Sequence, residues 1–132
     1  MNMEPKEYKM RVVRGAFIDP GALDKLGAKT IEKLERSEWQ SIDEITANLK
    51  QIKELQKNMI RHYDDTVVPW YMDGYGVEDQ KEIIVAFGAD DGEEGKVFQF
   101  MRNDKKVIGE VTEYGTSKGI PKDQMDFMDI NF

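Results

Sequence analysis

The sequence contains no cysteine and a single histidine among its 132 residues. Without cysteine, the chain cannot form disulfide bonds, zinc–thiolate sites or a cysteine nucleophile. One histidine cannot supply the paired imidazoles of an H-E-x-x-H zinc site, and the sequence has neither of the glycine-rich phosphate-binding patterns G-x-x-x-x-G-K-[ST] and G-x-G-x-x-G. We therefore expect no bound metal, no cofactor and no catalytic residue, and we favour a protein that is not an enzyme.

Long apolar runs are missing as well. No stretch approaches the roughly 18 apolar residues that a membrane-spanning helix needs. The first ten residues, MNMEPKEYKM, carry acids and a proline where a signal peptide has an apolar core. Together with the absence of cysteine, these features predict a cytoplasmic protein with no membrane partner. The length suits a single domain over 1–132, with residues 1–7 frayed.

Charge is distributed unevenly along the chain. Nineteen Lys and Arg residues face 26 Asp and Glu residues, which gives a net charge of −7. Residues 1–60 hold eleven bases and ten acids, whereas residues 61–132 hold eight bases and sixteen acids, so the halves carry +1 and −8. Because an acidic half repels phosphate backbones, nucleic acid is an unfavoured partner. A protein with a basic surface is the partner that this half predicts.

The first half of the chain predicts one strand and two helices. Residues 8–18 are rich in β-forming side chains and predict a strand. The D-P-G residues that follow can open a helix, which we predict over about 20–36. A second helix is predicted over 42–63, because S-I-D-E at 41–44 matches a capping box and apolar residues follow at intervals of three and four. That helix would be roughly 33 Å long at 1.5 Å per residue.

The second half alternates strand and turn signals. Pro69 disfavours helical geometry before it, so 66–72 is predicted to be extended and 73–76 to form a turn. Strands are predicted over 82–88 and 96–102, joined as an antiparallel hairpin by the acidic loop A-D-D-G-E-E-G. This loop does not match the calcium-binding EF-hand pattern, so we interpret it as a solvated hairpin tip.

Residues 105–118 fit two interpretations. Alternation and β-branched side chains favour a third strand. The flanking residues favour a helix, because Asp104 suits an N-cap, Gly119 suits the left-handed position after a helix, and Pro121 cannot continue one. We predict the helix.

These elements predict an α+β fold. A small, mainly antiparallel sheet would pack on two N-terminal helices, the second of them long, and a short C-terminal helix would follow. The sheet would bury its Ile, Val, Phe and Trp side chains against the pair of helices.

The stretch 61–76 combines the only histidine with carboxylates and aromatic rings. A ligand-binding site here would use imidazole and carboxylate groups beside an aromatic wall. Its candidate residues are His62, Asp65, Trp70, Tyr71 and Asp73. The competing interpretation is a structural junction, in which positive charge complements the end of the helix and the aromatic residues cover the core. We favour the junction, because it accounts for more of these residues.

The C-terminal nine residues, QMDFMDINF, mix acids with large apolar side chains. They resemble the acidic tips of bacterial single-stranded-DNA-binding proteins, whose terminal Phe and carboxylate enter pockets on partner proteins. The resemblance departs from that pattern at Asn131, where the tips have proline, and at Met128, which interrupts the acidic run. It implies docking on a partner, whereas the apolar side chains themselves also suit packing on this domain. The docking candidates are Phe127, Asp129, Ile130 and Phe132.

Three functions follow as hypotheses. The first is a non-catalytic interaction protein, such as an inhibitor, an immunity-type protein or an accessory factor, which presents its acidic C-terminal half to a basic surface. The second is a small-molecule-binding domain or modest enzyme with a pocket near His62 and Trp70. The third is a homodimer built on the long helix.

Overall fold

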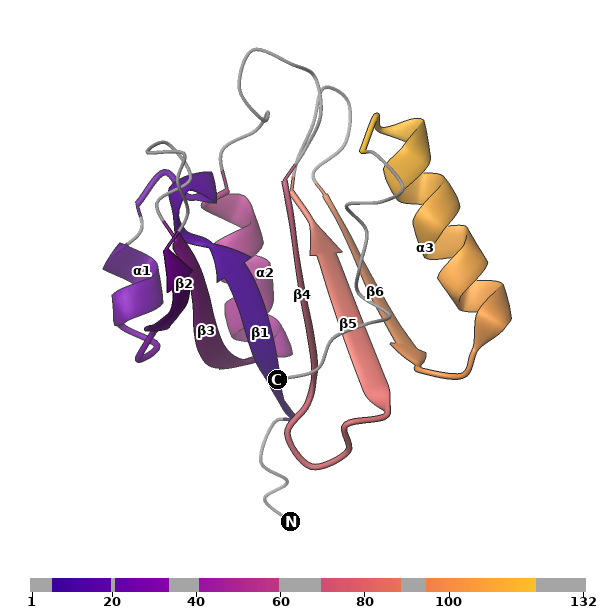
Figure 1. Ribbon diagram of the computed structural model, residues 1–132, viewed down its shortest axis with the longest axis horizontal. Helices are drawn as coiled ribbons and strands as arrows, with labels where there is room; N and C mark the ends of the chain where they lie inside the picture. The colour runs from indigo at the N-terminus through magenta and orange to yellow at the C-terminus, as the bar shows by residue number, and fades with distance from the viewer. Residues whose placement is uncertain (1–5, 20, 34–40, 60–69, 89–94, 121–132) are drawn as a thin grey trace.

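The central feature of the structure is a six-stranded antiparallel sheet with helices on both faces (Figure 1). The structure is a computed structural model, and it describes residues 6–19, 21–33, 41–59, 70–88 and 95–120. The elements in chain order are β1 (Glu7–Val13), the short 3-10 helix η1 (Arg14–Ala16), α1 (Gly21–Asp24), β2 (Lys29–Lys33), β3 (Ser41–Asn48), α2 (Leu49–Lys57), β4 (Tyr71–Gly76), β5 (Glu82–Phe87), β6 (Lys96–Met101) and α3 (Lys105–Ser117).

The strands lie in the order β2-β3-β1-β4-β5-β6, and each neighbouring pair is antiparallel. The first strand of the chain therefore lies inside the sheet, between β3 and β4. Its register aligns Tyr8 with Ala47 on one side and with Gly76 on the other. β2 and β6 form the two edges of the sheet.

Two apolar clusters cover opposite faces of the sheet. Side chains two residues apart along a strand point to the same face, so Met10 and Val12 of β1 meet α2 on one face. On the other face, Val85 and Phe87 of β5 meet Val111 of α3. The two helices thus cover different halves of the sheet as well as different faces, and Figure 1 shows α3 beside β6 and α2 beside β1 and β3.

The predicted packing of the sheet on two N-terminal helices is wrong. The described residues form three α-helices spread along the chain, and in place of the predicted long helix over 42–63 the structure has strand β3 followed by the nine-residue helix α2. The capping box lies at Asn48 and Gln51, whose side chains each accept from the other's backbone N–H at 2.9 Å. The apolar residues of β3 are spaced as in a helix, but the segment pairs with β1 on one side and with β2 on the other. The backbone hydrogen bonds of these two ladders outweigh the local preference for a helix.

Two shorter predictions also fail. Among the described residues of the predicted helix over 20–36, only the four of α1 are helical, and 29–33 forms β2, which pairs with β3. The predicted turn over 73–76 is part of β4. Its glycines allow strands to pack closely: a Cβ added to Gly74 would lie 2.3 Å from the backbone oxygen of Lys9.

The predictions for β5, β6 and α3 are confirmed, whereas most of the predicted extended segment over 66–72 and of the acidic hairpin tip lies outside the described residues. β1 covers the first part of the strand predicted over 8–18, but Arg14–Ala16 forms η1 instead. β5 and β6 occupy the strand regions predicted over 82–88 and 96–102, and they pair as an antiparallel hairpin. Residues 105–117 form α3, where Asp104 Oδ1 accepts a hydrogen bond from the backbone N–H of Val107 at 3.2 Å. Gly119 has a φ of 94°, as the sequence predicts for the residue after the helix. In the described part of the chain, none of the helices is both long enough and apolar enough to cross a membrane.

Candidate partner-binding end of the sheet

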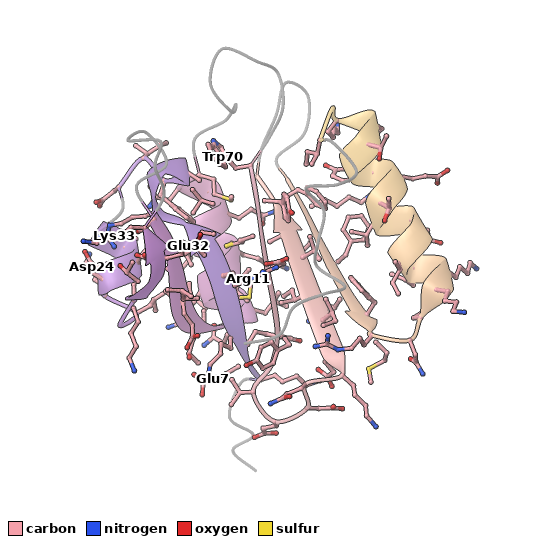
Figure 2. All side chains as sticks on the ribbon, in the orientation of Figure 1. Glu7, Arg11, Asp24, Glu32, Lys33 and Trp70 are labelled. Atoms are coloured by element: carbon pink, nitrogen blue, oxygen red, sulfur yellow. The ribbon has the colours of Figure 1, made fainter. Side chains whose placement is uncertain are left out.

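Several strands of the sheet begin or end at one common end. β2 ends and β3 begins at this end, where Lys33 is aligned with Ser41. β5 also ends here, and its last residue, Phe87, is aligned with the first residues of β4 and β6, Tyr71 and Lys96. We call this the loop-bearing end; it lies at the top of Figure 1, and Figure 2 labels Trp70 there and Glu7 at the opposite end.

Four of the chain segments outside the described residues adjoin this end. Segment 34–40 connects β2 to β3, segment 60–69 connects α2 to β4, and segment 89–94 connects β5 to β6. The segment from residue 121 onward follows α3, whose Tyr114 ring lies 4.8 Å from the ring of Phe87 between centroids. Because Phe87 marks the end of β5, α3 also terminates at the loop-bearing end.

Direct contacts join the anchor residues of these segments to one another. The backbone N–H of Gly88 donates to the backbone oxygen of Trp70 at 2.7 Å, which ties the end of β5 to the start of β4. Phe17 forms an isolated antiparallel bridge with Met59, the last described residue before segment 60–69. A Cβ added to Gly88 would lie 3.4 Å from Cβ of Met59, so these two anchors are also in contact.

Gln56 fixes the anchors of the acidic loop 89–94. Its Nε2 donates a hydrogen bond to the backbone oxygen of Phe87 at 2.6 Å, and the side chain is buried. Gly95, on the other side of the loop, has a φ of 108°, and a Cβ there would lie 2.7 Å from this Nε2. Glycine is therefore required at 95 both by its backbone conformation and by the close approach of α2.

The charges of the described residues nearly cancel, whereas the segments at the loop-bearing end are strongly acidic. The described residues contain sixteen bases and fourteen acids, which leaves three bases and twelve acids for the rest of the chain. All three of those bases and eleven of those acids belong to segments 34–40, 60–69, 89–94 and 121–132. These four segments together carry a net charge of −8.

Ion pairs cross the strands of the described sheet. Arg11 makes a bidentate contact with Asp73, with its Nε 3.2 Å from Oδ1 and its Nη2 2.9 Å from Oδ2. Arg11 is aligned with Glu44 on its other side, and Glu44 is in turn aligned with Lys29, so charge alternates along this row. Opposite charges that face each other across neighbouring strands stabilise a sheet, and the positive and negative charges of this row cancel.

Arg14 connects η1 to two carboxylates. Its Nη2 lies 2.6 Å from Oδ2 of Asp24, and its Nη1 lies 3.0 Å from Oδ2 of Asp43. These hydrogen bonds raise the pKa of Arg14, and the bond from Arg14 lowers the pKa of Asp24. Asp43, which is 1% exposed, also accepts a hydrogen bond from Ser41 Oγ at 2.7 Å. This cluster is a structural one.

The sequence-predicted ligand site has three described members. Trp70 packs against the apolar cluster on the α2 face, whereas Tyr71 packs against the cluster on the α3 face, with its ring 5.6 Å from that of Phe87. The two rings therefore do not form one wall. Asp73 is buried and paired with Arg11. The candidates His62, Asp65, Phe127, Asp129, Ile130 and Phe132 lie outside the described residues.

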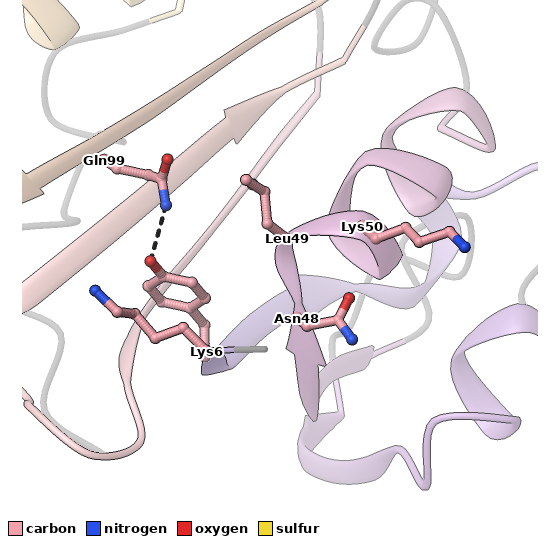
Figure 3. A pocket seen from close by; sticks show the side chains of 6 residues that line it. Lys6, Asn48, Leu49, Lys50 and Gln99 are labelled. Atoms are coloured by element: carbon pink, nitrogen blue, oxygen red, sulfur yellow. Dashed lines mark hydrogen bonds between the residues drawn. The ribbon is translucent and has the colours of Figure 1, made fainter. Parts of the chain in front are cut away.

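A hollow of about 350 Å³ lies between the start of α2 and β6 (Figure 3). It is lined by Lys6, Tyr8, Asn48, Leu49, Lys50 and Gln99. Gln99 Nε2 donates to Tyr8 Oη at 2.8 Å, and Lys6 Nζ contacts Glu82 at 3.0 Å, so these polar groups already have partners within the protein. In Figure 3 the side chain of Lys50 points away from Gln99. The hollow therefore does not direct a set of free polar groups at a ligand.

One hydrolase-like pattern lies elsewhere in the sequence, outside 61–76. G-T-S-K-G at 115–119 matches G-x-S-x-G, in which the nucleophilic serine occupies a turn between a strand and a helix. Here the pattern lies at the C-terminal end of α3, and Ser117 Oγ donates to the backbone oxygen of Tyr114 at 2.6 Å. The geometry is therefore not that of a nucleophile elbow. Among the described residues, no group of three or more His, Cys, Asp or Glu side chains is arranged to hold a metal ion.

No family model matches the sequence, and no curated protein and no solved structure matches the chain. The loop-bearing end is the candidate site, on the evidence of its geometry and charge.

Proposed function

We propose that the protein is a non-catalytic interaction domain that binds a partner protein with a basic surface at its loop-bearing end. The observation that carries this proposal is the convergence of anchor residues. Segments with eleven acids and three bases start from one end of a sheet whose own charges nearly cancel. A concentration of one sign of charge on one side of a protein orients a partner of opposite charge and accelerates its association.

The dimensions of this end suit a protein partner. Six strands at about 4.8 Å spacing make the end roughly 24 Å wide. A protein–protein interface of standard size covers about 800 Å² on each partner, a patch roughly 28 Å across, which is close to this width. The hydrogen bonds from Gln56 and Gly88 hold the anchors of two acidic segments in place, which supports a defined binding surface.

The two alternative functions have less support. A small-molecule pocket near Trp70 would need its neighbouring rings on one face, and Trp70 and Tyr71 pack on opposite faces. A homodimer through the long helix depended on a helix over 42–63 that the structure replaces with β3 and α2. In addition, α2 directs Ile52 and Leu55 into the core.

The test compares two variants that each remove four negative charges. The loop variant changes the four acids of segment 89–94: Asp90→Asn, Asp91→Asn, Glu93→Gln and Glu94→Gln. The control variant changes four acids outside the acidic segments, three of them exposed on α2 and α3 and one on the β4–β5 connection: Glu54→Gln, Glu78→Gln, Glu110→Gln and Glu113→Gln. Both variants have the same net charge, so only the location of the acids differs.

Each protein is immobilised and exposed to a lysate of the cells that produce it, and the retained proteins are quantified by mass spectrometry. The proposal predicts proteins of positive net charge that the wild type and the control retain, that the loop variant retains at least about tenfold less, and that salt releases. Equal retention by both variants would refute a role for this end in binding.

A further inference from the structure

The two edge strands of the sheet are attached to it in different ways. β2 forms one edge and β6 the other, and each pairs with a single neighbouring strand. Every residue of β2 is exposed, whereas β6 contributes side chains to the apolar clusters on both faces of the sheet. Because buried apolar surface adds to the stability that the backbone ladder supplies, the two edges should differ in strength.

β2 is held by its backbone ladder alone. Four of its residues are aligned with β3, and a register shift between Thr30 and Glu32 leaves Ile31 without an aligned partner. No side chain of β2 forms a hydrogen bond or an ion pair with another described residue. A backbone hydrogen bond that is exchanged for one to water changes the free energy only slightly, so little opposes separation of β2 from β3.

β6, in contrast, is held from both faces. Six of its residues are aligned with β5 without a register shift. On one face Phe100 is buried, and the ring of Phe98 lies 5.5 Å from that of Tyr114 between centroids. On the other face the side chain of Gln99 donates to Tyr8 Oη at 2.8 Å. Separation of β6 would therefore expose apolar side chains as well as break its ladder.

The elements next to β2 have attachments of their own. Leu23 of α1 is fully buried, and the backbone N–H of Ala28 donates to its backbone oxygen at 3.2 Å. Ala28 also packs against the apolar cluster on the α2 face. β3 is held by seven aligned pairs with β1 and buries Ile45 and Ala47. Both α1 and β3 can therefore stay in place without β2, and the point of rotation lies between Ala28 and Lys29.

We infer that β2 is a detachable edge strand, which separates from β3 in the folded protein while α1, β3 and the rest of the sheet keep their positions. The edge of the sheet thus has two states, one closed by β2 and one in which the backbone groups of β3 are open to water. This inference goes beyond the proposed function and does not depend on it, because it concerns only residues that the structure describes.

Native-state hydrogen exchange of the full chain, measured for individual amides by NMR, tests the inference. The comparison is between the amides of β2 and of β6 that donate hydrogen bonds within the sheet. Protection factors in β2 should be lower by about 100-fold or more. They should not change at low urea concentrations, because a local opening exposes little new surface. Equal protection of the two edge strands, or an equal dependence on urea, would overturn the inference.

An engineered disulfide can lock β2, because the chain contains no cysteine. Lys29 and Glu44 are aligned partners, and Cα atoms of such pairs are about 4.5–5.5 Å apart, which suits a disulfide. The oxidised variant with Lys29→Cys and Glu44→Cys should protect β2 about tenfold or more above its own reduced form, which controls for folding.

The matched control is a disulfide on the other side of β3. Lys9→Cys and Thr46→Cys join an aligned pair of β1 and β3, so their oxidation should leave exchange in β2 unchanged. If the lock between β2 and β3 does not slow exchange in β2, or if the control disulfide slows it equally, exchange does not occur through separation of β2 from β3 and the inference fails.

Discussion

Gln56 and Phe87 are 31 residues apart in the chain, and the side-chain amide of Gln56 lies 2.6 Å from the backbone oxygen of Phe87. This hydrogen bond links α2 to the end of β5, where the acidic loop 89–94 begins. Both residues are buried, so water cannot replace the donor without a rearrangement.

Gln56→Leu should therefore destabilise the protein. The substitution keeps a side chain of similar length but leaves the buried oxygen of Phe87 without its donor, which costs about 1–3 kcal/mol. Urea unfolding measures the change, and Lys53→Leu, at an exposed position on the same helix, is the control. Equal stability of the two variants would show that this hydrogen bond contributes nothing.

Two glycine-to-alanine substitutions should change stability in opposite directions. A Cβ at Gly74 would lie 2.3 Å from the backbone oxygen of Lys9 and 2.5 Å from Sδ of Met10, so Gly74→Ala should destabilise by about 1–3 kcal/mol. Gly109 lies within α3 and has nothing within 4 Å of such a Cβ. Gly109→Ala should stabilise by about 0.5–1 kcal/mol, because alanine favours the helix. Thermal unfolding distinguishes the two, and a destabilised Gly109→Ala would contradict this account of α3.

Arg14→Met should cost much more than Lys9→Met. Removing Arg14 leaves the carboxylate of Asp43, which is 1% exposed, without its cation, and breaking a buried pair in this way costs roughly 3 kcal/mol. Lys9 pairs with Glu44 at 3.4 Å in a more exposed setting, where such a pair contributes about 1 kcal/mol or less. Urea unfolding at neutral pH measures the unfolding free energy of both variants. Similar losses of stability in Arg14→Met and Lys9→Met would refute the special role of Asp43.

The contribution of Asp24 should depend on pH. Hydrogen bonding from Arg14 lowers the pKa of Asp24 in the folded protein below its value of about 3.9 in the unfolded chain. The folded state therefore gains stability above that unfolded value, and it loses the gain as pH falls through the lower folded value. The difference in unfolding free energy between wild type and Asp24→Asn should shrink between pH 6 and pH 2.5. A difference that stays constant over this range would contradict the pairing.

Local chemistry was sufficient to predict part of the fold. The helix α3 was identified from its ends, since Asp104 caps its start and Gly119 follows it. The β5–β6 hairpin was identified from two short β-rich runs around a loop. In each case the determining interactions join residues that are near in sequence.

The strand β3 was mistaken for a helix for an identifiable reason. Its buried positions are Ser41, Asp43, Ile45 and Ala47, so two of the four core-facing side chains are polar. Asp43 is tolerated there because Arg14 and Ser41 supply hydrogen bonds, and Arg14 is 29 residues away. The strand therefore lacks the alternation of apolar and polar residues by which a sequence indicates a strand. Its buried Asp43 depends on Arg14, which only the tertiary structure brings close.

The candidate site was predictable in its charge but not in its location. The acidic excess of residues 61–132 can be counted from the sequence. The common end at which the acidic segments start follows from the strand order, which local patterns do not encode.

The interior position of β1 has a consequence for how the chain assembles during translation. β1 can pair with β3 once residue 48 has left the ribosome, but its other edge stays open until β4, which ends at Gly76, has also emerged. A nascent chain of intermediate length therefore presents an unpaired strand edge, which is the kind of surface that recruits chaperones or neighbouring chains. The two-sided pairing of β1 is thus complete only once the chain has been made as far as Gly76.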